Sequence, residues 1–340
     1  MNPAVSSANS IVATGPERTE FQALISGCAV YDLSGKVCIA VTGSDRVRWL
    51  NGMVTNNVRD LAIEQGVYAF LLNPQGRILG DLYAYNVGDA LIVETDKTQL
   101  TKILETFERY IIMDDVEVAD ISNRQSIVGV TGPRAQAILA ASGLPVPAMR
   151  PLQFMTKPWL GKEATIVRGD MPAVESYEIW VSPEDAESTR AAIAGTGATP
   201  VGATALEWMR IISGIPRYGS DIREKDLPQE TEQQRALNFN KGCYIGQEIV
   251  ERIRSRGAVH RQFTGFAIEG MLPDAGVDLQ VGGKKVGEIT SAASVPLGDG
   301  IRDMALGYIR RELAALNEPL DCGRFQAMPV NLPFNEFFPK

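Results

Sequence analysis

The chain alternates short runs of apolar, β-branched residues with amphipathic stretches, and one joint between the two occurs twice. Val-Thr-Gly stands at 41–43 and again at 130–132, each time between a predicted strand and a predicted helix. Strands are expected over 37–42 and 126–131, and the helices that follow them over 45–52 and 133–141. This repetition indicates either a duplicated α+β lobe or the ordinary likeness of strand–turn–helix joints.

Between the two joints, three β-rich runs are separated by strong turn signals. The runs cover 67–72, 77–87 and 91–95, and the turns contain Asn73-Pro74-Gln75-Gly76 and Gly88-Asp89. They predict an antiparallel meander. Asp96 then caps a helix expected over 97–110, where apolar residues recur at helical spacing. Strands followed by single helices, without strict alternation, predict the α+β class.

The second half of the chain changes character near residue 260. Residues 143–163 contain four prolines and little periodicity, and they are interpreted as a connection. Strands are expected at 164–168 and 177–181, and helices at 182–194 and 203–212. Short β-rich runs at 262–268, 284–289, 305–309 and 325–328 predict a small β-barrel. We therefore expect a flexible tail over 1–20, two α+β lobes over 21–256 and a barrel domain over 257–340.

Composition excludes several classes of function. The net charge is −8, so the chain has no general attraction for nucleic acid or anionic membranes. His260 is the only histidine, and none of the four cysteines forms a Cys-x-x-Cys pair, so no metal site is predicted. Sparse cysteines, no recognisable signal peptide and no apolar run long enough to cross a membrane indicate a cytoplasmic protein.

The most informative segment is Lys241-Gly242-Cys243-Tyr244-Ile245-Gly246-Gln247-Glu248. Its glycines permit a close backbone approach to a ligand, and Lys241 could lower the pKa of the Cys243 thiol. A turn with a packed cysteine is the simpler alternative. The octapeptide resembles the KGCYxGQE signature of the YgfZ family, relatives of the glycine-cleavage T-protein. Further similarity extends over roughly 25–310, including Trp49-Leu50, Tyr68, Asp81-Leu82 and Ile215-Pro216-Arg217.

This resemblance implies a three-lobed ring with tetrahydrofolate in a central channel and the signature loop close to it. It implies a role in assembly or repair of iron–sulfur enzymes, with iron–sulfur client or assembly proteins as partners and a weaker link to tRNA modification. Cys243 and Asp81 are the candidate catalytic residues. The candidate folate-binding residues are Tyr68, Asn73, Asp81, Glu175, Glu178, Arg210, Lys241, Tyr244, Gln247, Arg252 and Arg254.

Two positions depart from the T-protein pattern. Gly80 stands where T-proteins have the first of two aspartates, in Gly-Gly-Ile-Leu-Asp-Asp-Leu, and Ile212 stands where they have the glutamate of Arg-x-Glu-x-Gly. A carboxylate suits the donor edge of a pterin ring, so Ile212 weakens the usual folate pose. Glu175 or Glu178 could supply the missing carboxylate. Both departures count against a folate-dependent aminomethyltransferase or demethylase, which is the alternative function.

A row of arginines follows the signature. Read as a strand, residues 252–256 place Arg252, Arg254 and Arg256 on one face. Such a row could hold the glutamate tail of a folate, form a solvated basic edge or, less well in an acidic chain, contact tRNA phosphates. Three functions follow from the sequence: a folate-binding factor for iron–sulfur enzymes, a folate-dependent one-carbon transferase, and a scaffold that binds no folate.

Overall fold

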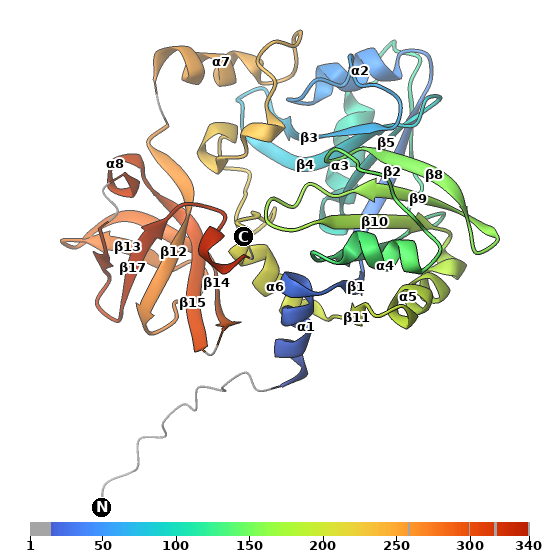
Figure 1. The fold of residues 1–340 in the computed structure, drawn as a ribbon. Coiled ribbons are helices and arrows are strands. Elements are labelled where there is room, and N and C mark those ends of the chain that lie inside the picture. The colour runs from blue at the N-terminus through green and yellow to red at the C-terminus, as the bar shows by residue number, and fades with distance from the viewer. Residues whose placement is uncertain (1–14, 258, 299, 316–317, 339–340) are drawn as a thin grey trace, which may run out of the picture.

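The computed structural model describes residues 15–257, 259–298, 300–315 and 318–338, and these form three β-sheets with flanking helices (Figure 1). The chain therefore has the mixed α and β content that the sequence predicts. Two of the sheets stack face to face, and the third lies to one side of them (Figure 1).

The first lobe is an antiparallel sheet in the order β3-β4-β5-β2-β6. The strands are β2 (Lys36–Thr42), β3 (Gln65–Leu72), β4 (Ile78–Asn86), β5 (Leu91–Asp96) and β6 (Glu117–Asp120). The helices α2 (Arg46–Met53) and α3 (Leu100–Tyr110) cover one face of this sheet, where Ile39, Leu50 and Phe107 are fully buried. The predicted meander and its following helix are confirmed, and Asp96 accepts a hydrogen bond from the backbone N–H of Thr98 as the expected cap.

The second lobe has the order β11-β1-β7-β10-β9-β8. Its strands are β1 (Ala29–Asp32), β7 (Ser126–Thr131), β8 (Phe154–Trp159), β9 (Lys162–Arg168), β10 (Ser176–Val181) and β11 (Thr199–Pro200). The helices α4 (Ala135–Ala141) and α5 (Ala186–Gly195) cover its outer face. Strand β8 was missed in the sequence because Pro158 interrupts the pattern. That proline is tolerated because β8 is an edge strand that pairs only with β9.

The two lobes repeat one plan, which supports the duplication interpretation. In each, a central strand (β2 or β7) leads into a helix, a three-stranded meander and a second helix. Gly43 and Gly132 end the two central strands with φ of 97° and 134°. A Cβ at Gly43 would lie 2.1 Å from the carbonyl oxygen of Asp115, and one at Gly132 2.5 Å from that of Gly27. Both turns therefore require glycine.

The N-terminal boundary differs from the expectation. Residues 1–14 lie outside the described residues, but α1 (Pro16–Ser26) begins inside the predicted tail. Phe21 and Leu24 are buried, and the Phe21 ring meets the Trp208 ring edge to face at 5.7 Å. The helix is therefore anchored by apolar packing against α6 (Ala203–Ile212).

The third sheet has the order β13-β14-β15-β12-β17-β16. Its strands are β12 (Arg261–Gly270), β13 (Asp278–Val281), β14 (Lys284–Leu297), β15 (Gly300–Arg310), β16 (Leu320–Asp321) and β17 (Phe325–Val330), with the short helix α8 (Arg311–Ala314) after β15. The edge strands β13 and β16 lie against each other, so the sheet nearly closes into a barrel. The four predicted strands are present, and the two edge strands are additional.

The arginine segment is helical, so the prediction of a one-faced strand is wrong. Gly246, with φ of 81°, precedes α7 (Gln247–Arg256), and Glu248 in the first turn suits the positive end of a helix. Residues two apart point in different directions on a helix. Arg252 is exposed, while Arg254 pairs with Glu251 at 3.5 Å and lies 4.4 Å from the centre of the Phe239 ring. Arg252 and Arg254 therefore do not form a row.

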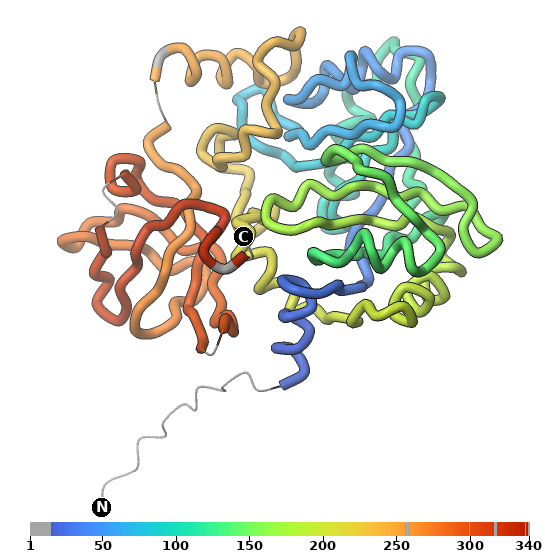
Figure 2. The backbone as a smooth tube through the Cα atoms, viewed as in Figure 1, coloured from blue at the N-terminus to red at the C-terminus, as the bar shows by residue number. Residues whose placement is uncertain are grey.

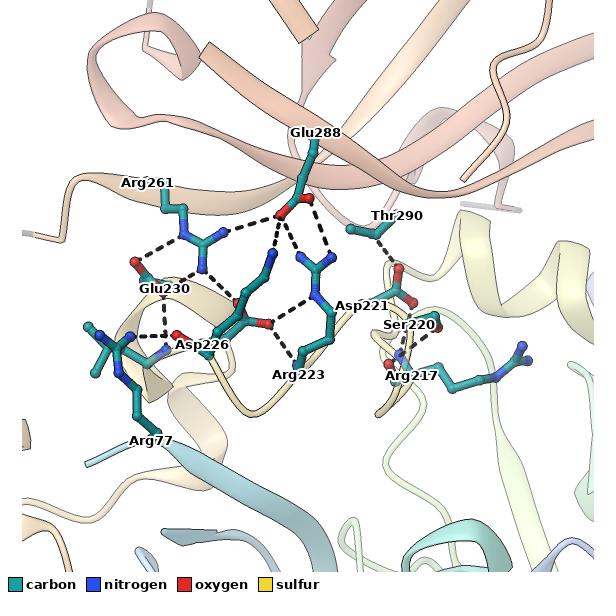
Figure 3. A network of polar contacts seen from close by, with 12 residues as sticks. Arg77, Arg217, Ser220, Asp221, Arg223, Asp226, Glu230, Arg261, Glu288 and Thr290 are labelled. Atoms are coloured by element: carbon teal, nitrogen blue, oxygen red, sulfur yellow. Dashed lines mark hydrogen bonds and ion pairs between the residues drawn. The ribbon is translucent and has the colours of Figure 1, made fainter. Parts of the chain in front are cut away.

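The segment after α6 connects the lobes to the barrel and includes the 3₁₀ turns Pro228–Thr231 and Gln234–Ala236 (Figure 2). A network of charged side chains fastens this segment to the barrel strands (Figure 3). Arg261 of β12 binds Asp226 at 2.6 Å and Glu230 at 3.0 Å, and Arg223 binds Glu288 of β14 at 2.5 Å. Asp226 is fully buried, so its charge depends on these partners.

Candidate functional site

A cavity of about 420 Å³ lies where the two stacked sheets meet α6 and residues 215–218. Strands β2, β4 and β5 supply its polar wall, with Lys36, Asp81 and Glu94, and α6 supplies Met209 on the opposite side. Tyr218 also lines it and donates a hydrogen bond to the carbonyl oxygen of Leu79 at 2.6 Å. The cavity is large enough for a small organic ligand, and ionisable groups including Lys36, Asp81 and Glu94 gather on one wall.

Asp81 is held rigidly at this wall. Tyr68 donates from its hydroxyl to Oδ2 at 2.7 Å, Gln99 donates to Oδ1 at 2.8 Å, and Thr95 donates to the backbone carbonyl of Asp81 at 2.9 Å. Burial raises the pKa of the Asp81 carboxyl, and the bonds from Tyr68 and Gln99 oppose this only in part. A fixed carboxyl whose pKa moves towards neutrality is suited to acid–base chemistry.

A second layer of residues lies around Asp81, and only Tyr83 among them lines the cavity. The Arg235 guanidinium lies 4.3 Å from the centre of the Tyr68 ring and pairs with Asp170. Tyr83, which lines the cavity, donates to Asp170 at 3.1 Å. Tyr68 therefore acts behind Asp81, because it supports the carboxylate without lining the cavity itself.

Lys36, Glu94 and Glu178 form a second charged group. The Lys36 ammonium donates to Glu94 at 2.5 Å and to Glu178, which comes from the other sheet. Burial and the neighbouring Glu178 raise the pKa of Glu94 to about 8. Burial also acts against ionisation of Glu178, but the charge of Lys36 and the hydrogen bonds from Glu94, Lys36 and Trp180 together outweigh it and lower the pKa of that carboxyl. Glu178 thus reaches the cavity wall through Lys36.

Arg210 lines the cavity, but its donors are already used. It binds Glu207 through Nε and Nη2, Asp221 at 2.6 Å, the carbonyl oxygen of Ile215 at 2.7 Å and the Ser291 hydroxyl at 2.8 Å. These contacts join α6, the connecting segment and the barrel. Arg210 is therefore a positioning residue for the cavity wall.

The signature loop is fastened to the first lobe. The Lys241 ammonium is buried and donates to the backbone carbonyls of Asn51 at 2.5 Å, Val54 at 2.7 Å and Asn56 at 2.7 Å. The first two carbonyls lie at the C-terminal end of α2, where the helix dipole favours a cation. Burial lowers the pKa of Lys241 to about 7, and the charge of Arg59 adds to this. Within the described residues, no ion pair or hydrogen bond joins Lys241 to Cys243.

Glycine holds the other end of the loop. A Cβ at Gly246 would lie 2.6 Å from the carbonyl oxygen of Asn73, in the β3–β4 turn. Cys243 is exposed between these two anchors. Tyr244 is buried with its ring centre 5.0 Å from the Lys241 nitrogen, and Gln247 begins α7.

The structure thus separates the predicted site residues into two groups. Asp81, Tyr68, Arg210 and Glu178 gather at or directly behind the cavity wall. The following lie elsewhere on the described chain: Asn73, Glu175, Lys241, Cys243, Tyr244, Gln247, Arg252 and Arg254. Glu175 faces Arg168 at 3.9 Å.

Sequence reasoning missed Lys36, Glu94, Tyr83, Tyr218 and Arg235. A signal for the first two was present, since Lys36 stands at the start of an apolar, strand-forming run and Glu94 at the end of another.

Two absences apply to the described residues. They contain no group of three or more His, Cys, Asp or Glu side chains that could hold a metal ion. None of their helices is long and apolar enough to cross a membrane.

A model of the GCVT N-terminal domain family matches residues 12–241 of the chain, which includes both lobes, α6 and the segment leading to Lys241. The protein belongs to the GCVT N-terminal domain family. Aminomethyltransferases of this family use tetrahydrofolate, in agreement with the cofactor expected from the sequence.

Named relatives of the chain include aminomethyltransferases. That of Rubrobacter xylanophilus is 28% identical over 324 residues, covering 93% of this chain and 86% of the relative. A chloroplastic protein of Arabidopsis thaliana, At1g60990, whose name gives it as a candidate transferase, is 27% identical over 300 residues, covering 88% of this chain and 69% of the relative.

Among solved structures, the glycine cleavage system aminomethyltransferase T of Bartonella henselae is similar with a TM-score of 0.82 and 21% identity. The similarity covers 95% of this chain and 90% of that protein, so the two share their fold over nearly the whole length.

The two departures from the T-protein pattern can now be placed in this GCVT fold. A Cβ at Gly80 would lie 2.9 Å from Oε1 of Gln99 and 3.4 Å from Cδ1 of Ile103, so position 80 faces α3 and turns away from the cavity. The carboxylate that the sequence retains, Asp81, is the one that faces the cavity. Ile212 is fully buried in an apolar cluster that includes Phe263, and it does not line the cavity.

Proposed function

We propose that this GCVT-family protein binds tetrahydrofolate in the cavity and uses it in one-carbon transfer of the aminomethyltransferase type. The observation that carries the proposal is the position of Asp81, a partly buried carboxyl at the cavity wall that Tyr68 and Gln99 hold in place. The named aminomethyltransferases that resemble the chain over most of its length support the same function. On this proposal, the two stacked lobes and the barrel correspond to a three-lobed ring around the folate.

The residues at the cavity fit a folate. Its volume of about 420 Å³ lies within the range of small-molecule sites. A pterin ring presents several N–H donors, and the cavity wall offers carboxyl oxygens from Asp81 and Glu94 that can accept from them. Bound tetrahydrofolate supplies the nitrogen atoms that carry the one-carbon unit. Asp81 would hold or accept a proton at Oδ1 or Oδ2, and the apolar side chains of α6 would keep water from the reacting atoms.

Thermal unfolding with and without tetrahydrofolate, under anaerobic conditions, tests binding. At about 100 times its dissociation constant, a ligand that binds only the folded state adds about 2.7 kcal/mol to the free energy of unfolding, so the melting temperature should rise clearly. An unchanged melting temperature at millimolar tetrahydrofolate would contradict the proposal and favour the scaffold that binds no folate.

A second candidate function is support of iron–sulfur enzymes, as in the YgfZ family, and one observation favours it. Cys243 is exposed on a loop that Lys241 and Gly246 fix to the first lobe, whereas Cys28 and Cys38 are buried. A single cysteine cannot hold a cluster alone, so a client protein or a small thiol would supply the other ligands. The cytoplasmic location and the link to tRNA modification remain predictions that belong to this second candidate function.

Replacing Cys243 by alanine tests the second candidate. In a strain that lacks this protein, Cys243→Ala is expected to leave the activities of iron–sulfur enzymes low, because the exposed thiol is gone while the loop anchors remain. The matched control is Cys322→Ala, a partly exposed cysteine in the barrel, which should restore them. Equal rescue by both variants would remove any role for the Cys243 thiol.

A further inference from the structure

The Lys36–Glu94–Glu178 group is unusual because its charges do not balance in the interior. Glu94 comes from β5 of the first sheet and Glu178 from β10 of the second, and both contact the one ammonium of Lys36. Glu94 is fully buried, and only 13% of the Glu178 side chain is exposed. Two carboxylates and one ammonium would leave a net negative charge at the interface of two apolar sheet faces, which is energetically costly.

The hydrogen bonds point to the form in which the charges balance. If both carboxyls were ionised, the buried Oε2 of Glu94 would have no hydrogen-bond partner. A proton on Glu94 lets that carboxyl donate to Glu178, and the two side chains are close enough for this bond. One proton therefore neutralises the group and supplies the missing bond, as in other carboxyl pairs that share a proton.

The group also has access to the cavity. Lys36 and Glu94 both line it, and 27% of the Lys36 side chain is exposed. Charged and titratable groups from each neighbouring element surround Glu94: Lys36 and Cys38 on β2, Tyr83 and Tyr85 on β4, Tyr31 on β1 and Glu178 on β10. Burial raises the pKa values of Cys38, Tyr31 and Tyr85, so these three groups stay neutral near pH 8, where Glu94 titrates.

We propose that Lys36, Glu94 and Glu178 store one exchangeable proton at the cavity wall and deliver it, through the Lys36 ammonium, to a basic nitrogen of the ligand bound there. This inference rests on the proposed folate-dependent function and adds a second acid–base group to Asp81. In one coupled step, an N–H bond of Lys36 breaks as an N–H bond of the ligand forms, and Nζ takes the proton of Glu94 as the O–H bond of that carboxyl breaks. No neutral lysine forms on the way, because, against the effect of burial, Glu178 and Glu94 raise the pKa of Lys36. The group ends with one ammonium and two carboxylates and is recharged from solvent when the ligand leaves.

The pH dependence has a definite sign. The pKa of Glu94 rises from its ordinary value of 4.5 to about 8 in the folded protein, so at neutral pH the folded state binds a proton that the unfolded chain has lost. The stability that this proton contributes is complete below pH 4.5 and is lost as the pH rises through about 8. Glu94→Gln should remove this loss, which extends from about pH 5 to pH 8. Its amide oxygen can accept from Lys36 and its amide N–H can donate to Glu178, as the protonated acid does.

Two measurements test the proton store on the full chain. The first needs no ligand: infrared difference spectroscopy should show the carbonyl band of a neutral carboxylic acid that disappears as the pH passes through about 8. The band should be absent in Glu94→Gln and present in the control Glu105→Gln, an exposed glutamate on α3. A band that persists in Glu94→Gln, or no titrating band in the wild type, would overturn the inference.

The second measurement is calorimetric titration with tetrahydrofolate at pH 7.5 in two buffers of different ionisation enthalpy. The wild type is expected to exchange a fraction of a proton with the buffer on binding, and Glu94→Gln to bind with no such exchange. Undiminished exchange in Glu94→Gln would refute the transfer to the ligand. If tetrahydrofolate does not bind to the wild type at all, the proposed function fails, while the infrared result still decides whether the proton is stored.

Discussion

Arg261→Met is expected to lower the free energy of unfolding by about 3 kcal/mol, because it leaves buried carboxylates without their cation. Asp226 is fully buried and would lose its 2.6 Å contact, and Glu230 would lose its 3.0 Å contact (Figure 3). Arg223 remains near Asp226 at 3.6 Å, so the expected loss of stability is at the lower end of the range of about 3–5 kcal/mol for breaking a buried ion pair. Methionine retains much of the apolar volume that packs on the Tyr308 ring, so the loss should be electrostatic.

The matched control for this prediction is Arg310→Met. Arg310 lies opposite Arg261 in the register of β12 and β15, but it is exposed. The control should change stability by less than about 0.5 kcal/mol, as most exposed substitutions do. Urea unfolding monitored by tryptophan fluorescence measures both variants. Equal losses for the two would mean that the network of Figure 3 contributes nothing specific.

Asp81→Asn is expected to lower the rate of any folate-dependent one-carbon transfer by about 10² to 10⁴, the usual contribution of a positioned acid or base. The amide cannot exchange a proton in the same way, yet it keeps the size of the aspartate. One of the two donors, Tyr68 or Gln99, would then face the amide nitrogen, so a stability loss of about 1 kcal/mol accompanies the change. The measurement is single-turnover formation of methylene-tetrahydrofolate from an aminomethyl or N-methyl donor.

The control for Asp81→Asn is Asp89→Asn, an exposed aspartate in the turn between β4 and β5 of the same meander. It should leave the transfer rate unchanged. If Asp81→Asn transferred one-carbon units as fast as the wild type, the carboxyl would only support the wall, and acid–base chemistry would have to come from elsewhere in the cavity. If neither the wild type nor the control shows transfer with any donor, the transferase proposal fails and the second candidate gains.

Local patterns predicted most of the fold because each depends on neighbours in the sequence. Residues 67–110 have the alternation and turn residues of a meander with a following helix, and these elements form as expected. The pattern misled where one residue broke it, as Pro158 did at the edge strand β8, or where two periods fitted one short segment. Residues 252–256 are polar at every second position, but Gly246 and Glu248 begin a helix there.

The cavity could be predicted only in part, because its residues come together through the stacking of two sheets. Asp81 was found through the family motif, and its direction followed from strand alternation only once the sheet face was known. From the sequence, Gly80 suggested that the cavity had lost a carboxylate. Strand alternation turns position 80 towards α3, so a side chain there would not face the cavity. Glu94 and Glu178 follow Lys36 by 58 and 142 residues in the sequence, and no local pattern relates the three. Lys241 looked like a partner of Cys243 because it is near in sequence, yet its three bonds go to carbonyls at the end of α2 and just beyond it.

Strand β1 gives the chain a definite order of assembly during synthesis. It lies at the N-terminus but completes the second sheet, between β7 and β11, whereas the first sheet uses only residues 36–120. As the chain leaves the ribosome, the first sheet can close at once, while β1 waits for β7 and α1 waits for α6, both of which are made later. A ribosome stalled after residue 150 should therefore carry a protease-resistant first lobe and a cleavable N-terminal segment.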